Sequence, residues 1–223
     1  MAATCVHRHA LHLSQQRMTE YSVMNVGILV FDEVELLDMA GPYEVFTTAA
    51  RVLARSQPPG TPALFSVTTI ARRPGTVRAR AGLRLQPDHG LADHPPLTCA
   101  IVPGGVVDAE LGQPDLLAWI AAQARTARIL ASVCTGALLL AQAGVLDGLD
   151  ATTHWEDLGA LHTLRPAVRV QDGVRWVDQG PVVTSAGISA GIDMSLHLVQ
   201  RLHSRDLALR TARQMDFDWR ASA

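Results

Sequence analysis

The sequence has few cysteines, and none of them forms a Cys-x-x-Cys pair. The three are Cys5, Cys99 and Cys134. An odd number without paired spacing argues against a disulfide framework and fits a reducing compartment, so we expect a cytoplasmic protein. The nine histidines show no His-x-x-x-His spacing, and no Cys/His cluster has the spacing of zinc ligands. This pattern excludes the common zinc motifs, and we expect no bound metal.

The sequence also lacks a strong charge of one sign and a long apolar run. Nineteen basic residues against twenty-one acidic residues give a net charge of −2, and the basic residues are scattered. We therefore expect no nucleic-acid partner. Gly, Asp or Arg interrupts every apolar stretch well short of the ~18 residues of a membrane-spanning helix, so we expect no membrane partner. No Gly-x-Gly-x-x-Gly fingerprint is present, and we expect no organic cofactor.

The remaining composition is typical of one sizeable α/β domain. Of the 223 residues, 48% are hydrophobic and 18% are charged. Residues 1–23 show no clear period and lack the apolar region of a signal peptide. We expect them to form a disordered N-terminal extension, and residues 24–223 to form a single domain. Because few residues follow Arg201, we expect no appended domain there.

Strand-like and helix-like segments alternate from Met24 onward. Short apolar runs rich in β-branched residues predict buried strands, and longer segments predict helices. Because the strands are apolar almost throughout, we expect a mostly parallel sheet with helices on both faces. The expected strands are 26–31, 64–70, 99–102, 127–133 and 182–184, the helices are 36–55, 115–126, 136–143, 188–201 and 205–214, and the hairpins are 77–85 and 168–177. Asp38, Gly41 and Pro42 are expected to interrupt the first turn of the first helix.

Cys134 lies between a predicted strand and a predicted helix. Enzymes of the α/β class place a nucleophile at such a turn, as in the Gly-x-Ser-x-Gly elbow, although this chain has Ser132 and Gly136 at the outer positions. Unpaired N–H groups and the positive end of the helix dipole favour the thiolate there. The alternative interpretation is a small buried core cysteine.

Other polar or flexible positions follow neighbouring predicted strands. Ligands of open α/β sheets bind beyond the carboxyl ends of the strands, which places Asp38, Gly104 and Gly105 near Cys134. The two glycine N–H groups, together with that of Thr135, are expected to form an oxyanion hole, with a plain strand-ending turn as the alternative. Apolar neighbours would raise the pKa of the Asp38 carboxyl and suit it to general-acid catalysis. The alternative for Asp38 is a helix cap.

His154 follows Cys134 by twenty residues (154 − 134 = 20). A Cys–His pair is a common means of activating a thiol. A core or interface histidine is the alternative, and spacing does not decide between the two because catalytic partners meet in space rather than in sequence.

Several segments together resemble the ThiJ/PfpI family of the class I glutamine amidotransferase-like superfamily. They extend from about Met24 to about Arg201, and their combination is far more specific than any one of them. The branch with the greatest resemblance contains isonitrile hydratases and the N-terminal domains of AraC-type regulators. The segments are Asp38-Met39-Ala40-Gly41-Pro42-Tyr43-Glu44-Val45-Phe46, Val102-Pro103-Gly104-Gly105, Ser132-Val133-Cys134-Thr135-Gly136, Ala143-Gly144-Val145-Leu146-Asp147-Gly148, Ala151-Thr152-Thr153-His154-Trp155 and Ser185-Ala186-Gly187-Ile188-Ser189-Ala190-Gly191-Ile192-Asp193.

This resemblance implies a flavodoxin-like three-layer sandwich, a homodimer, and Cys134 as a strained nucleophile. Asp38 stands where isonitrile hydratases carry Asp. Thr135 stands where family peptidases carry His, which argues against a protease. His154 matches a histidine that in some relatives lies near the cysteine, often close to the dimer interface. The resemblance also implies a pocket-lining loop, which here is Gly187, Ile188 and Ser189.

The function implied by the resemblance is hydration of a small isonitrile. The Cys134 thiolate attacks the isonitrile carbon while protonated Asp38 donates, and water then converts the thioimidate to an N-substituted formamide, with Thr135 and Gly105 helping to hold the developing charge. Two alternatives stay open at this point. One is a freestanding metabolite-sensing domain, and the other is a glyoxalase or redox-stress protein, whose relatives generally pair the cysteine with Glu and His.

Overall fold

The computed structural model describes residues 23–221, so Cys5 and nearly all of the predicted extension lie outside the described residues. Seven strands form one sheet in the order β10-β11-β7-β6-β1-β2-β5. Neighbouring strands run parallel except β10, which is antiparallel to β11. The strands are β1 (Met24–Val30), β2 (Phe65–Ala71), β5 (His89–Gly90), β6 (Cys99–Val102), β7 (Ile129–Val133), β10 (Trp176–Asp178) and β11 (Val182–Ser185).

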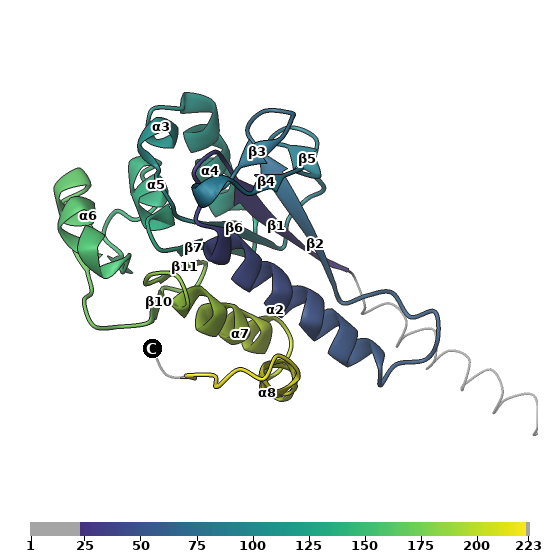
Figure 1. Ribbon diagram of the computed structural model, residues 1–223. Coiled ribbons are helices and arrows are strands. Elements are labelled where there is room, and N and C mark those ends of the chain that lie inside the picture. Colours follow the sequence, from purple (N-terminus) through teal and green to yellow (C-terminus); the bar gives the residue numbers. More distant parts are fainter. Residues whose placement is uncertain (1–22, 222–223) are drawn as a thin grey trace, which may run out of the picture.

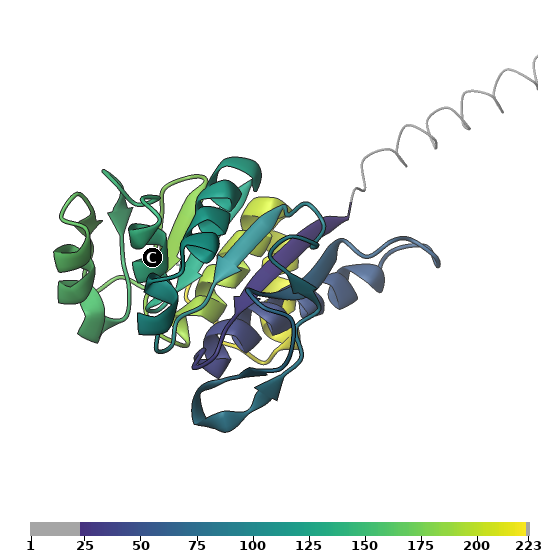
Figure 2. The same cartoon turned by 90° about the horizontal axis from the view of Figure 1, so that it is seen from above.

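Helices cover both faces of this sheet (Figures 1 and 2). One face carries α2 (Leu36–Ala54), α7 (Ala190–Leu202) and α8 (Arg205–Gln214). The other carries α3 (Asp108–Leu111), α4 (Pro114–Thr126), α5 (Gly136–Gln142) and α6 (Leu158–Leu164). The predicted fold class, a flavodoxin-like α/β sandwich with a mostly parallel sheet, is therefore confirmed.

The strand β1 shows why the central strands of the sheet are mostly apolar. Its residues Val26, Ile28 and Val30 belong to the core under α2, whereas Leu29 belongs to the core on the opposite face. All four are fully buried. A strand that is covered on both faces has no position that favours a polar side chain, so the sequence shows a continuous apolar run in place of alternation.

The first predicted hairpin forms and the second does not. The strands β3 (Val77–Arg78) and β4 (Arg84–Leu85) pair antiparallel around a short 3₁₀ turn, η1 (Arg80–Gly82). The hairpin predicted over 168–177 is wrong. There, β9 (Arg169–Val170) pairs in parallel with β8 (Asp150–Ala151), and β10 pairs with β11. The turn at Asp172-Gly173 is present, with Gly173 at φ 71°, but the two flanking segments pair with other strands and not with each other.

Helix boundaries differ from the prediction at two places near the site. The helix α2 runs without interruption through Asp38 and Pro42. Pro42 has no N–H to donate to the Asp38 carbonyl, and the helix nevertheless continues through it. The helix α7 begins at Ala190, and residues 187–189 form a loop before it. The short elements β5, β8, α3, α6 and η2 (Trp155–Asp157) were not predicted.

The topology brings four chain segments to one edge of the sheet. From β1 the chain continues to β2 on one side, while β6, β7 and β11 follow on the other, so the strand order reverses beside β1. Residues that follow these strands therefore meet at a position where α/β proteins bind ligands. In the part of the chain that the structure describes, no helix is long and apolar enough to span a membrane.

Candidate active site

Cys134 occupies a strained turn between β7 and α5. Its φ of 57° lies in the left-handed region, which non-glycine residues rarely adopt. Two hydrogen bonds hold the turn: the Cys134 N–H donates to the Ser185 carbonyl at 3.1 Å, and the Thr153 hydroxyl donates to the Cys134 carbonyl at 2.8 Å. A β-carbon at Gly136 would collide with the Val102 carbonyl. The elbow geometry expected from the sequence is present.

Asp38 lies beside the thiol and does not cap its helix. The position before α2 is taken by Glu35, and Asp38 itself is fully buried. Its Oδ2 atom accepts the Gly104 N–H at 3.0 Å, and the carboxyl is within hydrogen-bonding reach of Cys134. The second oxygen, Oδ1, accepts no hydrogen bond from nitrogen or oxygen atoms of residues 23–221. The buried carboxyl thus has one oxygen without a hydrogen-bond partner among the described residues.

Burial makes this carboxyl a weak acid. Removal from water, supported by the nearby charge of Glu35, raises the pKa of Asp38 to about 7, although the Gly104 N–H opposes the shift. A carboxyl with such a pKa is protonated for a large fraction of the time near neutral pH. It can therefore act as a general acid, as the apolar neighbours in the sequence indicated.

The same burial acts on the thiol. Burial first, and then the charge of Asp38, raise the pKa of Cys134 to about 12, although the N–H groups of Thr135 and Ile188 donate to the sulfur and lower it. The N–H groups at the turn favour the thiolate, as expected from the sequence, but burial outweighs them in the free site. Protonation of Asp38 removes the opposing charge and supplies a donor to the sulfur. The two groups consequently titrate as a pair.

We predict that the Asp38→Asn variant removes a pH-dependent penalty on folding. Between about pH 4 and pH 7, the unfolded chain ionises Asp38 while the folded chain retains the proton, because the folded pKa is raised to about 7. Stability contributed by Asp38 therefore falls as pH rises through this window. Urea unfolding at pH 5 and pH 8 should show the stability of Asp38→Asn improving, relative to wild type, at the higher pH. An equal difference at both values would contradict the shift.

The glycines after β6 do not form the expected oxyanion hole. The Gly104 N–H is donated to Asp38, and the Gly105 N–H is donated to Thr135 Oγ1 at 2.9 Å. The Thr135 hydroxyl in turn donates to the Gly105 carbonyl at 2.8 Å. Of the three expected N–H groups, that of Thr135 reaches the sulfur. Gly104 instead leaves room for two neighbouring side chains, since a β-carbon there would lie 2.5 Å from Thr135 Oγ1 and 2.9 Å from Asp38 Oδ2.

The loop 187–189 supplies the second N–H group at the sulfur. Ile188 has a φ of 43°, an unusual conformation for a β-branched residue, and its N–H donates to Cys134. Its side chain is 38% exposed. Ser189 precedes α7 and makes no side-chain cap. The structure thus brings this predicted pocket loop to the candidate nucleophile.

His154 lies against the same loop and not in a pair with the thiol. Its ring packs on Gly187, and Nδ1 lies 3.5 Å from Asp157 Oδ2 and 3.7 Å from Glu156 Oε2. The groups that hydrogen-bond the sulfur come from Asp38, Thr135 and Ile188. Within residues 23–221, no three His, Cys, Asp or Glu side chains are placed to hold a metal ion together.

Sequence analysis missed the residues that brace the elbow. Thr153 and Ser185 bind the backbone of Cys134, and both are buried. Thr153 immediately precedes His154, which the sequence indicated as the candidate because imidazole is the more reactive group. A hydroxyl in an apolar segment could have indicated Thr153 as a buried hydrogen-bond donor, but its partner is not local and no spacing rule predicts it.

A buried cysteine at a strained strand–helix turn, with an acidic residue from α2 beside it, matches a known family. The family model described as the DJ-1/PfpI family matches residues 24–201. The chain belongs to the DJ-1/PfpI family. Among solved structures, that of a ThiJ/PfpI family protein from Pseudomonas syringae superposes with a TM-score of 0.76 at 27% identity, covering 88% of this chain and 76% of the other. Drosophila melanogaster DJ-1beta, at 17% identity and TM-score 0.75, shows the fold alone.

Curated relatives of this family member include an enzyme and a transcriptional regulator. Isonitrile hydratase of Pseudomonas putida is 36% identical over 198 residues, which cover 87% of this chain and 78% of that enzyme. The transcriptional regulator GbdR of Pseudomonas aeruginosa is 34% identical over 184 residues, or 82% of this chain. The chain spans about half the length of that regulator, since the match covers 48% of it. Similarity alone therefore does not separate an enzyme from a regulatory module.

Proposed function

We propose that this protein adds water to an isonitrile and forms an N-substituted formamide, with Cys134 as nucleophile and Asp38 as acid and base. The observation that carries the proposal is the fully buried Asp38 carboxyl, whose Oδ1 is unpaired within the described chain, beside the Cys134 thiol. The similarity to isonitrile hydratase from Pseudomonas putida supports the same reaction class.

In the first step, the substrate R–N≡C enters with its terminal carbon at the sulfur. The Asp38 carboxylate takes the proton of the Cys134 thiol, and Asp38 then gives this proton to the isonitrile carbon while the sulfur forms a bond to that carbon. The product is the thioimidate R–N=CH–S, and Asp38 is left as the carboxylate. The N–H groups of Thr135 and Ile188 favour the thiolate form that attacks. Because the Asp38 carboxylate itself accepts the thiol proton, no separate base is required.

In the second step, water adds to the thioimidate carbon. The Asp38 carboxylate takes one proton from the water and passes it to the nitrogen, giving a tetrahedral carbon that bears S, OH and NH–R. The C–S bond then breaks, Asp38 takes the hydroxyl proton and passes it to the sulfur, and the formamide R–NH–CHO leaves. The carboxyl and the sulfur recover their starting state, so the sum is one isonitrile plus one water.

The direct test is to incubate the wild-type protein with an aryl isonitrile and to follow the formyl proton of the formamide by NMR. The mechanism predicts turnover and, under rapid acid quench, a thioimidate mass on the peptide that contains Cys134. A reaction in ¹⁸O-labelled water should place the label in the formamide oxygen. Turnover without a Cys134 adduct would contradict the covalent step, and absence of turnover would contradict the function.

A second candidate is a sensing module. It is favoured by the similarity to GbdR, whose matched part corresponds to most of this chain. In a sensor, a ligand would bind at the same site without release of a formamide. Binding of an isonitrile that shifts the melting temperature, with no product after long incubation, would support this candidate over hydration.

A further inference from the structure

The last described residues cross the beginning of α7 and are held there by a buried carboxylate. We define residues 215–221 as the C-terminal strap. The Trp219 indole N–H donates to the Asp193 carbonyl at 3.1 Å, and the Arg220 N–H donates to Asp193 Oδ1 at 2.9 Å. Asp193 is fully buried in the first turn of α7. The backbone of Arg220 is therefore fixed relative to the loop that precedes this helix.

The charge of Asp193 is already compensated by another residue. Arg175 donates to Asp193 Oδ2 from Nε at 2.5 Å and from Nη2. The Arg220 guanidinium, in contrast, forms no hydrogen bond or ion pair with the described residues and is exposed. Of the two arginines near the start of α7, Arg220 thus has a positive charge that is available to a ligand.

Both arginines line a pocket of about 570 Å³ beside the candidate active site. The loop residues Gly187, Ile188 and Ser189 form part of its wall, and the Ile188 N–H is the group that contacts the sulfur. His154 and Trp155 also line the pocket. Of the carboxylates near this pocket, Glu156 and Asp157 flank Nδ1 of His154, and Asp193 is paired with Arg175. The Arg220 end is the part that suits an anion.

We propose that this pocket binds a carboxylate carried by the substrate, and that Arg220 is the residue that selects for it. That the bound molecule is a substrate rests on the proposed function. The preference for an anion near Cys134 does not depend on that function. A guanidinium held at a pocket rim by a fixed backbone pairs well with a carboxylate because it offers several N–H donors in one plane. Substrates with an acidic group should therefore react better than matched neutral ones.

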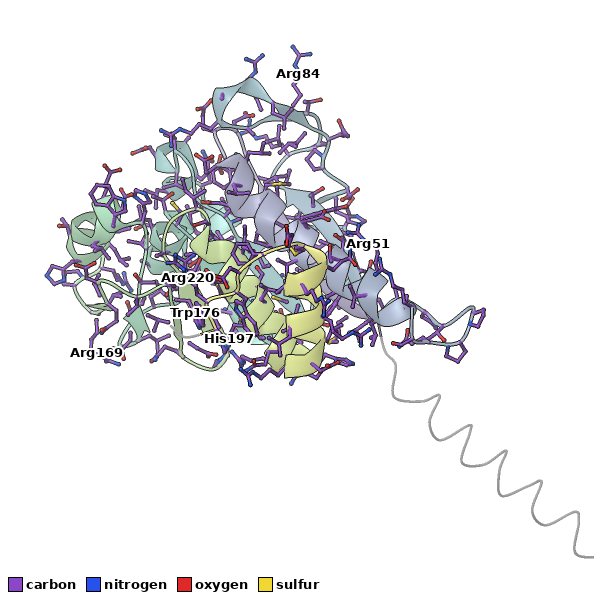
Figure 3. The ribbon with its side chains drawn as sticks, turned by 60° about the horizontal axis from the view of Figure 1, so that its bottom comes forward. Arg51, Arg84, Arg169, Trp176, His197 and Arg220 are labelled. Carbon is purple, nitrogen blue, oxygen red and sulfur yellow. The ribbon has the colours of Figure 1, made fainter. Side chains whose placement is uncertain are left out.

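The substrate test compares isocyanoacetate with its neutral methyl ester. Wild type should show the higher kcat/KM for the acid, and Arg220→Ala should lower the acid-to-ester ratio by about three- to tenfold. The substitution keeps the backbone N–H that anchors the strap. Arg84→Ala is the matched control, because Arg84 is also exposed and lies in a distant part of the molecule (Figure 3). It should leave the ratio unchanged.

A second measurement separates the pocket from the proposed function. Iodoacetate and iodoacetamide both alkylate the Cys134 sulfur by displacing iodide, and they differ in one carboxylate. Arg220→Ala should slow iodoacetate severalfold relative to iodoacetamide, read by mass spectrometry of the Cys134 peptide. If no isonitrile is hydrated, the proposed function is contradicted, and the ratio of the iodoacetate rate to the iodoacetamide rate alone tests the anion preference at Arg220. If Arg220→Ala and Arg84→Ala give the same ratios for both reagent pairs, the proposal is overturned.

Discussion

Replacing Cys134 with alanine is expected to lower kcat/KM for isonitrile hydration by about 10⁴-fold or more. The reason is that the sulfur forms the bond that activates the carbon, and water alone would have to attack an isonitrile without a covalent intermediate. The measurement is formamide formation, with wild type and variant compared at equal concentration. Retention of full activity in Cys134→Ala would overturn the assignment of the nucleophile.

The controls for this prediction concern the fold. Cys134 is almost fully buried, but alanine removes a single atom, so we expect the free energy of unfolding to change by about 1 kcal/mol or less. Circular dichroism and urea unfolding should therefore match wild type closely. Cys134→Ser retains the volume and a weak nucleophile, and it should be nearly as inactive as alanine. A variant that is inactive because it is unfolded would be detected at this stage.

Replacing Asp193 with alanine is expected to destabilise the protein by about 3–5 kcal/mol. The carboxylate is fully buried and joins three parts of the chain: the segment before β10 through Arg175, the first turn of α7, and the C-terminal strap through Arg220. Its removal leaves the Arg175 guanidinium, which is only 26% exposed, without its counter-charge. Urea unfolding followed by circular dichroism measures the loss.

An exposed ion pair serves as the comparison. Asp206 and Arg210 lie one turn apart on α8, with 3.4 Å between Oδ2 and Nη1, and the Asp206 side chain is 77% exposed. Asp206→Ala should cost no more than about 0.5 kcal/mol, because water screens the pair. Asp193→Asn keeps an acceptor for the Arg220 N–H and should fall between the two alanine variants. Equal effects of the two alanine variants would contradict a structural role for the buried carboxylate.

An isonitrile hydratase and a transcriptional regulator both match most of this chain at similar identity. A site with a paired acid and thiol suits turnover, whereas a site that only senses needs the pocket and no transferable proton. Measurements on Cys134 and on the anion preference of its surroundings therefore address different properties of one site. The homodimer stays a prediction.

Local sequence pattern determined the architecture because it reflects periodicity and steric demand. Apolar runs such as that of β6 predicted a doubly covered sheet, and the junction of a predicted strand and a predicted helix placed Cys134 at a turn. The hairpin predicted over 168–177 shows the limit of this approach. A turn signal such as Asp172-Gly173 predicts a change of chain direction. The strands with which the two flanking segments pair depend on which sheet edges lie nearby.

The sequence by itself thus determined the fold class, the family and the position of the candidate nucleophile. Only the tertiary structure decided the chemistry at that position. Asp38 meets Gly104 across 66 residues of sequence, and Arg220 meets Asp193 across 27. The pKa of a buried group depends on the water that distant segments exclude and on the N–H groups that they supply. A helix N-terminus read from sequence favoured a thiolate, and burial in the assembled core reversed that balance.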